Sequence, residues 1–226
     1  MAARAIIGFA VYLILVPAVL LAAGGDARWP MGWAYAGLYV VAAAGSRLVS
    51  LKVSPEMLRE RAAALQAAEV PAWDRWLVFI AALMGPLSAV LVAGLDHRFG
   101  WPPPIAFPLQ LVGLVPLALG YALGVWAMLV NRFFSSFVRV QSNRGHHAIT
   151  GGPYAFVRHP AYAGGILSSV AAPLMLDAVW AWLPVAVIVA ALVLRTDLED
   201  RLLRDRLPGY AEYASRVRYR LIPAGW

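Results

Sequence analysis

The chain has 226 residues, of which 62% are hydrophobic and 14% charged, and its mean hydropathy is +0.69. This composition excludes a soluble domain of that length and predicts an integral membrane protein. The absence of cysteine excludes disulfides, thiolate zinc sites and cysteine nucleophiles, and with four histidines as the only soft ligands we expect no metal centre. The net charge of +7 indicates a nucleic-acid partner only if membrane topology does not account for the arginines.

The first segment, residues 1–50, is predicted to form a transmembrane hairpin. Its apolar run from Ala5 to Ala23 is long enough for one crossing, which takes about 20 residues. A cleavable signal peptide is the alternative for such a run. We favour the hairpin because a short turn leads from it directly into a second apolar run, Trp29 to Val49.

The next segment, residues 51–76, carries charges of both signs. Ser54 is a suitable helix N-cap and Pro55 suits the first helical position, so a helix is predicted to begin there. We interpret the segment as a connector helix on the cytoplasmic surface of the membrane. A lid over a cytoplasmic site is the alternative.

Residues 77–130 are predicted to form a second transmembrane hairpin. Its two apolar runs, Leu77 to Leu95 and Phe107 to Val130, are separated by residues 96–104, which we interpret as a stiff, non-helical turn because they end in three prolines. Small residues four and seven positions apart in the second run are predicted to permit close contact between helices. They are Gly113, Gly120 and Gly124.

Residues 131–226 begin with a long polar segment and continue with an apolar run from Pro160 to Leu194 that is too long for one crossing. Pro160 suits the first position of a helix, where free backbone amides favour anions. Pro173 and Pro184 are predicted to divide the run into two helices joined by a tight turn.

The tail, from Arg195 to Trp226, is predicted to be helical as far as Pro208-Gly209. Its last residues alternate tyrosines and aliphatic residues with arginines, a pattern typical of a segment that lies on the bilayer surface.

These segments together predict an all-α, polytopic membrane protein with about six transmembrane helices and an amphipathic C-terminal segment on the cytoplasmic side. The basic residues test this count. Of the 19 lysine and arginine residues, only Arg28 and Arg98 fall in the loops opposite the N-terminus. Because cytoplasmic loops carry the excess of basic residues, both termini are expected in the cytoplasm, and nucleic acid is not needed to explain the net charge.

Individual charged residues of the last segment have simple structural interpretations. Arg195 and Glu199 are four apart on a predicted helix and suit a salt bridge. Arg158 alone suits a membrane anchor that extends its charge to the interface, and His159 a hydrogen-bonded interfacial residue. A functional site is favoured because these groups gather at one face of the membrane.

The polar motifs from Asn131 to Trp226 also occur in a characteristic order. They are Gly152-Pro153-Tyr154, Arg158-His159-Pro160 with Tyr162 and Gly164, the acidic pair Glu199-Asp200, Pro208-Gly209-Tyr210 with Tyr213, and Arg220-Leu221-Ile222-Pro223. In order and spacing this region resembles the isoprenylcysteine carboxyl methyltransferase family of integral membrane enzymes. In its bacterial members, Pro55 to Arg75 also has a counterpart.

The resemblance implies that residues 131–226 form a catalytic region that binds S-adenosylmethionine at the cytoplasmic side and receives a lipophilic acceptor from the lipid, in a bacterial inner membrane. Arg195 matches the arginine associated with the acceptor carboxylate. The family's acidic pair is Glu-Glu, so the shorter Asp200 has no assigned role. The implied cofactor-binding residues are Gln141, His146, His147, Ala148, Ile149, Tyr154, His159, Pro160, Ala161, Tyr162 and Glu199.

Three alternatives remain open. Related membrane methyltransferases act on small thiols or phospholipid amines, which must lose a proton and would require His146, His147 or His159 as a base. Sterol-type membrane reductases that use NADPH have a broadly similar C-terminal half. A scaffold or small transporter is the third alternative, although transport usually involves charged residues within the membrane and the predicted spans contain almost none.

Overall fold

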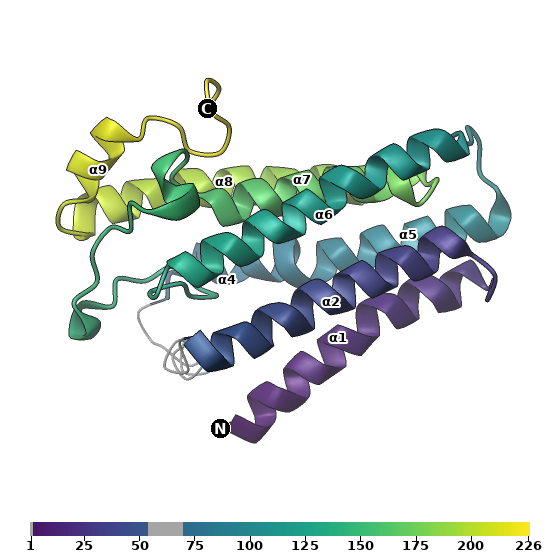
Figure 1. The fold of residues 1–226 in the computed structure, drawn as a ribbon, viewed down its shortest axis with the longest axis horizontal. Helices are drawn as coiled ribbons and strands as arrows, with labels where there is room; N and C mark the ends of the chain where they lie inside the picture. Colours follow the sequence, from purple (N-terminus) through teal and green to yellow (C-terminus); the bar gives the residue numbers. More distant parts are fainter. Residues whose placement is uncertain (1, 54–69) are drawn as a thin grey trace.

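A computed structural model of the chain describes residues 2–53 and 70–226, and every regular element in these ranges is a helix (Figure 1). The expected all-α class is therefore confirmed for this part of the chain. The predicted helix start at Ser54 and most of the expected connector lie outside the described residues.

The N-terminal helices form the predicted hairpin. Helix α1 (Ala2–Gly24) and helix α2 (Pro30–Val53) are joined by a short turn in which Gly25 has a φ of +63°. An oxygen of the Asp26 carboxylate accepts a hydrogen bond from the backbone N–H of Arg28 at 2.8 Å and thereby stabilises this turn.

The second hairpin contains a longer first helix than predicted. Helix α4 (Ala72–Phe79), a π-helical turn (Ile80–Met84) and helix α5 (Gly85–Phe99) follow one another without a break. The prediction that residues 96–99 form a non-helical turn was wrong. The helix ends at Gly100, which adopts the left-handed conformation and donates its N–H to the carbonyl of Asp96, so the prolines act only after this cap.

Helix α6 (Phe107–Val130) has the predicted bounds, and helix α7 (Pro160–Met175) begins at the predicted proline. The long apolar run is divided as expected: a turn with Asp177 at a φ of +58° and a 3₁₀ turn (Val179–Ala181) lead into helix α8 (Trp182–Arg206). Helix α8 joins the last apolar run and the charged tail helix into one element. Helix α9 (Tyr210–Arg216) follows.

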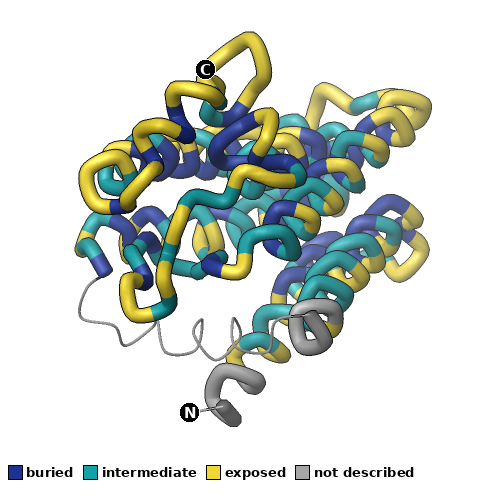
Figure 2. Tube along the Cα trace, turned by 60° about the vertical axis from the view of Figure 1, so that its left-hand side comes forward, coloured by how far each residue is buried: buried dark blue, intermediate teal, exposed yellow. Residues whose placement is uncertain are grey.

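Three helical stretches are long and apolar enough to cross a membrane among the residues that the structure describes: Ala72–Phe99, Phe107–Val130 and Val179–Arg206. Gly8–Gly24 is a shorter apolar helix. Buried positions concentrate where the helices face one another (Figure 2), and large apolar side chains point outward along α6. An apolar outer surface on apolar helices is what a lipid environment requires.

The arrangement of the helices places the polar segments together. One end of the bundle holds the end of α6, the beginnings of α4 and α7, the end of α8, and α9 (Figure 1). The irregular segment between α6 and α7 therefore faces the C-terminal part of the chain.

Candidate functional site

A cavity of about 390 Å³ lies at this end of the bundle. It is bordered by the segment between α6 and α7, the first turn of α7, the last turns of α8, and α9. Most of the residues predicted for the site line it. They are His146, His147, Ala148, Ile149, Tyr154, His159, Ala161, Tyr162, Arg195 and Glu199.

Two predicted residues, Gln141 and Pro160, do not line the cavity. Gln141 is buried behind its wall, where its amide nitrogen donates to the carbonyl of Phe133 at 2.7 Å and its amide oxygen accepts from Arg144 at 2.5 Å. Pro160 is fully buried at the start of α7. Both residues shape the wall from behind.

His146 is a neutral wall residue. Its Nδ1 accepts a hydrogen bond from the backbone N–H of Gln141 at 3.2 Å, and its ring centroid lies 4.5 Å from that of Phe133. Burial, and secondarily the neighbouring charges of His147 and Arg144, lower the pKa of His146 from 6.5 to about 4. The neutral ring with Nδ1 as an acceptor must carry its proton on Nε2.

Glu199 and Tyr162 are neighbours in the wall of the cavity, where the Tyr162 hydroxyl donates a hydrogen bond to Oε2 of Glu199 at 2.5 Å. The guanidinium of Arg195 lies 5.1 Å from the centroid of the Tyr162 ring. The expected Arg195–Glu199 salt bridge was wrong, because Arg195 is paired with Asp74 instead.

Asp74 is a site residue that the sequence did not reveal. Its side chain is fully buried in the first turn of α4, and it accepts hydrogen bonds from Nε of Arg195 at 2.7 Å and from the backbone N–H of Val138 at 2.6 Å. A buried carboxylate needs such partners, because desolvation of an unpaired charge is costly. In the sequence, Asp74 looked like one of several mixed charges in a surface connector.

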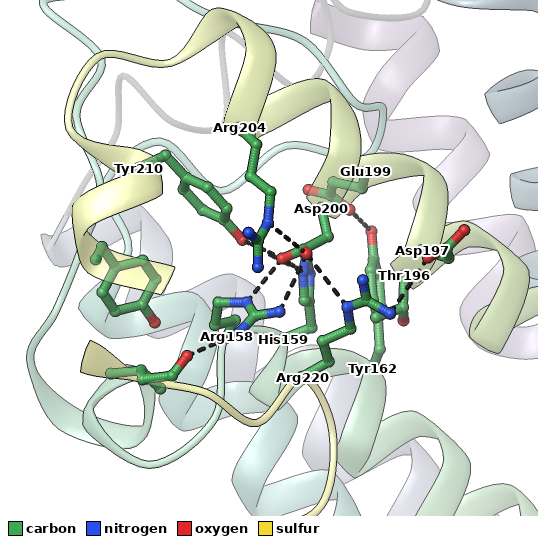
Figure 3. A network of polar contacts seen from close by, with 12 residues as sticks. Arg158, His159, Tyr162, Thr196, Asp197, Glu199, Asp200, Arg204, Tyr210 and Arg220 are labelled. Carbon is green, nitrogen blue, oxygen red and sulfur yellow. Dashed lines mark hydrogen bonds and ion pairs between the residues drawn. The ribbon is translucent and has the colours of Figure 1, made fainter. Parts of the chain in front are cut away.

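Asp200 is the centre of a buried polar cluster, which Figure 3 shows. Arg158 forms a bidentate contact with the Asp200 carboxylate, in which Nε donates to Oδ1 at 2.7 Å and Nη2 to Oδ2 at 3.0 Å. Tyr210, Arg204 and Arg220 also donate to it, at 2.9, 3.1 and 3.2 Å. The interpretation of Arg158 as an exposed membrane anchor was therefore wrong.

Arg158 and His159 also bind the C-terminal tail directly. Their backbone N–H groups donate to the carbonyls of Tyr219 and Arg220, both at 2.9 Å. Nη1 of Arg158 donates to the carbonyls of Val217 and Arg218, both at 2.7 Å. These contacts hold the tail against the loop that precedes α7.

Tyr210 and Tyr213 of the tail line the cavity, which corrects the expectation that they lie on the bilayer surface, whereas Tyr219 is exposed. Tyr210 and Tyr213 are buried, and the hydroxyl of Tyr213 donates to the carbonyl of Tyr154 at 2.7 Å. Burial raises the pKa of Tyr210, Tyr213 and Tyr154, so these hydroxyls stay protonated as hydrogen-bond donors. The apolar residues of α9 therefore pack against the site.

The chain is similar to known proteins in part of its sequence and in its fold. No curated protein sequence is significantly similar to it. The family model described as "Isoprenylcysteine carboxyl methyltransferase (ICMT) family" matches residues 111–205. A solved structure titled as the eukaryotic intramembrane Ras methyltransferase ICMT is 20% identical, with a TM-score of 0.54, and the similarity covers 96% of this chain and 78% of that one.

The structural similarity shows a shared fold, and the family match includes α7, most of α6 and α8, and the segment between α6 and α7. The resemblance read from the motifs is thereby confirmed: across residues 111–205 this chain has the sequence pattern of the isoprenylcysteine carboxyl methyltransferase family.

Proposed function

We propose that the protein is a membrane-embedded methyltransferase that uses S-adenosylmethionine to methylate the carboxylate of a lipophilic acceptor of the isoprenylcysteine type. The observation that carries this proposal is the single cavity in which the motif residues of the matched family region gather. Its volume of about 390 Å³ lies in the range of small-molecule sites.

The groups around the cavity fit the chemistry of this cofactor. S-adenosylmethionine has an ammonium, a carboxylate, ribose hydroxyls and an adenine, and when bound it supplies an electrophilic methyl group on a sulfonium. Glu199 offers acceptor oxygens for an ammonium or hydroxyl, and the tyrosine and phenylalanine rings offer flat walls. Ala161, in the first turn of α7, brings a helix N-terminus to the cavity, where the positive end of the helix dipole favours a carboxylate.

A carboxylate acceptor suits a site without a strong base, because it is already ionised at neutral pH. Methyl transfer is an in-line displacement, so the site has to align the partners and exclude water. Arg195 would orient the acceptor. Within the described part of the chain, Asp74 and Ser136 accept hydrogen bonds from its Nε and Nη2, which leaves Nη1 for a contact with the acceptor.

A thiol or amine acceptor is the second candidate and depends on a base. His146 lines the cavity, but its pKa of about 4 makes it a weak base at neutral pH. His147 and His159 also line the cavity, so the local geometry alone does not decide between the acceptors, and the carboxylate is preferred on the family match.

We also propose six crossings, both termini in the cytoplasm and residence in a bacterial inner membrane. In support, most of the basic residues that the structure describes belong to the segment after α6, the end of α8 and the tail, and these segments lie at the end of the bundle that holds the cavity (Figure 1). The turn between α1 and α2, which contains Arg28, and the end of α5, which contains Arg98, lie at the other end (Figure 1). This separation follows the rule that cytoplasmic loops are basic.

The test is transfer of a labelled methyl group from S-adenosylmethionine to lipids with carboxyl, thiol or amine heads. Glu199→Gln and His159→Ala are expected to weaken cofactor binding in titration calorimetry, and Arg195→Ala to spare it and reduce turnover. Because Arg195→Ala leaves Asp74 unpaired, the double variant with Asp74→Asn separates lost turnover from lost stability. Retention of NADPH without binding of S-adenosylmethionine would overturn the assignment in favour of a reductase.

A further inference from the structure

The imidazole of His159 has an unusual pair of neighbours at Nε2. This nitrogen lies 3.5 Å from the hydroxyl oxygen of Tyr210 and 3.5 Å from Oδ1 of Asp200 (Figure 3). The ring also stacks parallel to Tyr162, with 5.7 Å between centroids and 5° between planes. Its orientation is therefore restrained both on its face and at its edge.

Both neighbours can only accept a hydrogen from this nitrogen. Asp200 receives hydrogen bonds from Arg158, Arg204 and Arg220, which stabilise its ionised, acceptor-only form. Tyr210 donates its own proton to Oδ1 of Asp200 at 2.9 Å, and burial together with the charge of Asp200 raises the pKa of this tyrosine, so the proton stays there. The neutral His159 ring must therefore carry its proton on Nε2.

We propose that Asp200 is a positioning residue that, together with Tyr210, holds His159 in the Nε2–H tautomer and thereby leaves Nδ1 as an unprotonated acceptor for a ligand in the cavity. The ligand group would be an N–H or O–H donor. On the proposed function, on which this part rests, the donor is the ammonium or a ribose hydroxyl of the cofactor. A carboxylate that selects the tautomer of a functional histidine is a general device in enzymes.

The location of Asp200 explains why it acts through His159. Asp200 is fully buried and does not line the cavity, whereas Glu199 and His159 do. Arg158 contacts both oxygens of the Asp200 carboxylate through Nε and Nη2, and its Nη1 donates to carbonyls of the tail. The two members of the acidic pair thus have different roles, with Glu199 facing the cavity and Asp200 facing the tail.

The length of the side chain matters in this cluster. Asp200→Glu would add a methylene group to a fully buried site that already holds an arginine fork and a tyrosine hydroxyl. Asp200→Asn preserves the shape but removes the charge, and its amide can present either an N–H or an oxygen to His159. The tautomer would then no longer be selected.

The test uses the full chain in detergent with ¹⁵N-labelled histidine, since the chain has only four histidines. The ring-nitrogen chemical shifts are followed as the pH is raised until the His159 signals no longer change, so that the neutral ring is observed. Variants that each replace one of the other histidines, His97, His146 and His147, assign the His159 signals by elimination. The wild-type protein is expected to show His159 as the Nε2–H tautomer, and an Nδ1–H tautomer would overturn the proposal without any variant at Asp200.

In Asp200→Asn, His159 is expected to become a mixture of tautomers. Cofactor affinity should fall about tenfold, the usual effect of losing one well-placed hydrogen bond, while the KM for the acceptor stays unchanged. Arg201→Gln, which breaks an exposed ion pair with Asp197 at 2.7 Å, is the matched control and should change neither readout. If Asp200→Asn lowers the unfolding temperature but leaves the tautomer unchanged, Asp200 is only structural and the inference fails. If the tautomers behave as expected but no variant binds S-adenosylmethionine, the proposed function fails and the inference stands.

Discussion

Arg195 in α8 and Asp74 in α4 form a buried ion pair, with 2.7 Å between Nε and Oδ1, across 121 residues of sequence. Asp74 also accepts the backbone N–H of Val138, and Nη2 of Arg195 donates to the carbonyl of Ser136 at 2.9 Å. The pair therefore joins α4, α8 and the segment after α6 in one wall of the cavity. It also determines which nitrogen of Arg195 can meet an acceptor.

Asp74→Asn is expected to destabilise the protein strongly. The amide can still accept from Val138, but Arg195 would be left as a buried charge without a counter-ion, and breaking a buried pair typically costs about 3–5 kcal/mol. The measurement is the midpoint of thermal unfolding in detergent. Arg201→Gln breaks a pair of equal length whose arginine is 70% exposed, and should cost less than about 1 kcal/mol. Equal decreases in the unfolding midpoint of the two variants would show that burial does not increase the contribution of the Arg195–Asp74 pair to stability.

The sequence predicted those features that depend on local patterns. Helix α6 and the start of α7 were located correctly, because long apolar runs and a proline at the first helical position are local signals. Most of the residues predicted through motifs line the cavity, because a resemblance to a family assigns roles residue by residue.

The sequence could not predict which charged residues are buried together. Asp74 and Arg158 were interpreted as surface charges, since nothing in the neighbouring residues reveals a partner far along the chain. The tail was misread for a related reason: an alternation of tyrosine and arginine suits a bilayer surface and a protein surface equally well. Tyr210 and Tyr213 can lie buried because the carboxylate of Asp200 and the carbonyl of Tyr154 accept hydrogen bonds from their hydroxyls.

Tyr162→Phe is expected to weaken cofactor binding about tenfold while preserving the fold. The variant removes the 2.5 Å hydrogen bond that fixes the Glu199 carboxylate, and a hydrogen bond to a charged group contributes about 1.5–3 kcal/mol. The variant retains the aromatic ring, which the Arg195 guanidinium and the stacked His159 ring contact. Titration calorimetry with S-adenosylmethionine gives the affinity. An affinity equal to that of the wild type would show that Glu199 needs no orientation by Tyr162.

Acidification is expected to protonate His146 only near pH 4, because burial lowers its pKa to about 4. In the unfolded chain the same ring takes up a proton near pH 6.5. Between these two values the unfolded state binds more protons, so the contribution of His146 to stability is fully present above about pH 6.5 and is lost as the pH falls towards 4. Unfolding midpoints of the wild type and His146→Gln, compared at about pH 7.5 and 4.5, measure this contribution. The difference between the two proteins should shift in favour of the variant at the lower pH, and a constant difference would contradict the prediction.

Helices α6 and α7 approach each other backbone to backbone at Gly120 and Gly164. A Cβ on Gly164 would lie 2.5 Å from the carbonyl oxygen of Gly120 and 2.9 Å from the nitrogen of Gly124, whereas a Cβ on Gly124 would meet nothing within 4 Å. Backbone atoms cannot rotate away, so Gly164→Ala must separate the helices and is expected to cost about 1–3 kcal/mol. Gly124→Ala is the matched control on the facing helix and should be neutral or slightly stabilising, since alanine favours helix.

The same comparison tests whether this contact positions the site. Gly164 lies one turn into α7, close behind Ala161 and Tyr162, which line the cavity. Separation of α6 from α7 would therefore displace these two residues, and Gly164→Ala should lose cofactor affinity as well as stability. Thermal unfolding and titration calorimetry on both alanine variants decide the matter. If Gly164→Ala lowers the unfolding temperature and leaves the affinity intact, the close contact serves the bundle alone and the first turn of α7 is held by the tail contacts of Arg158 and His159.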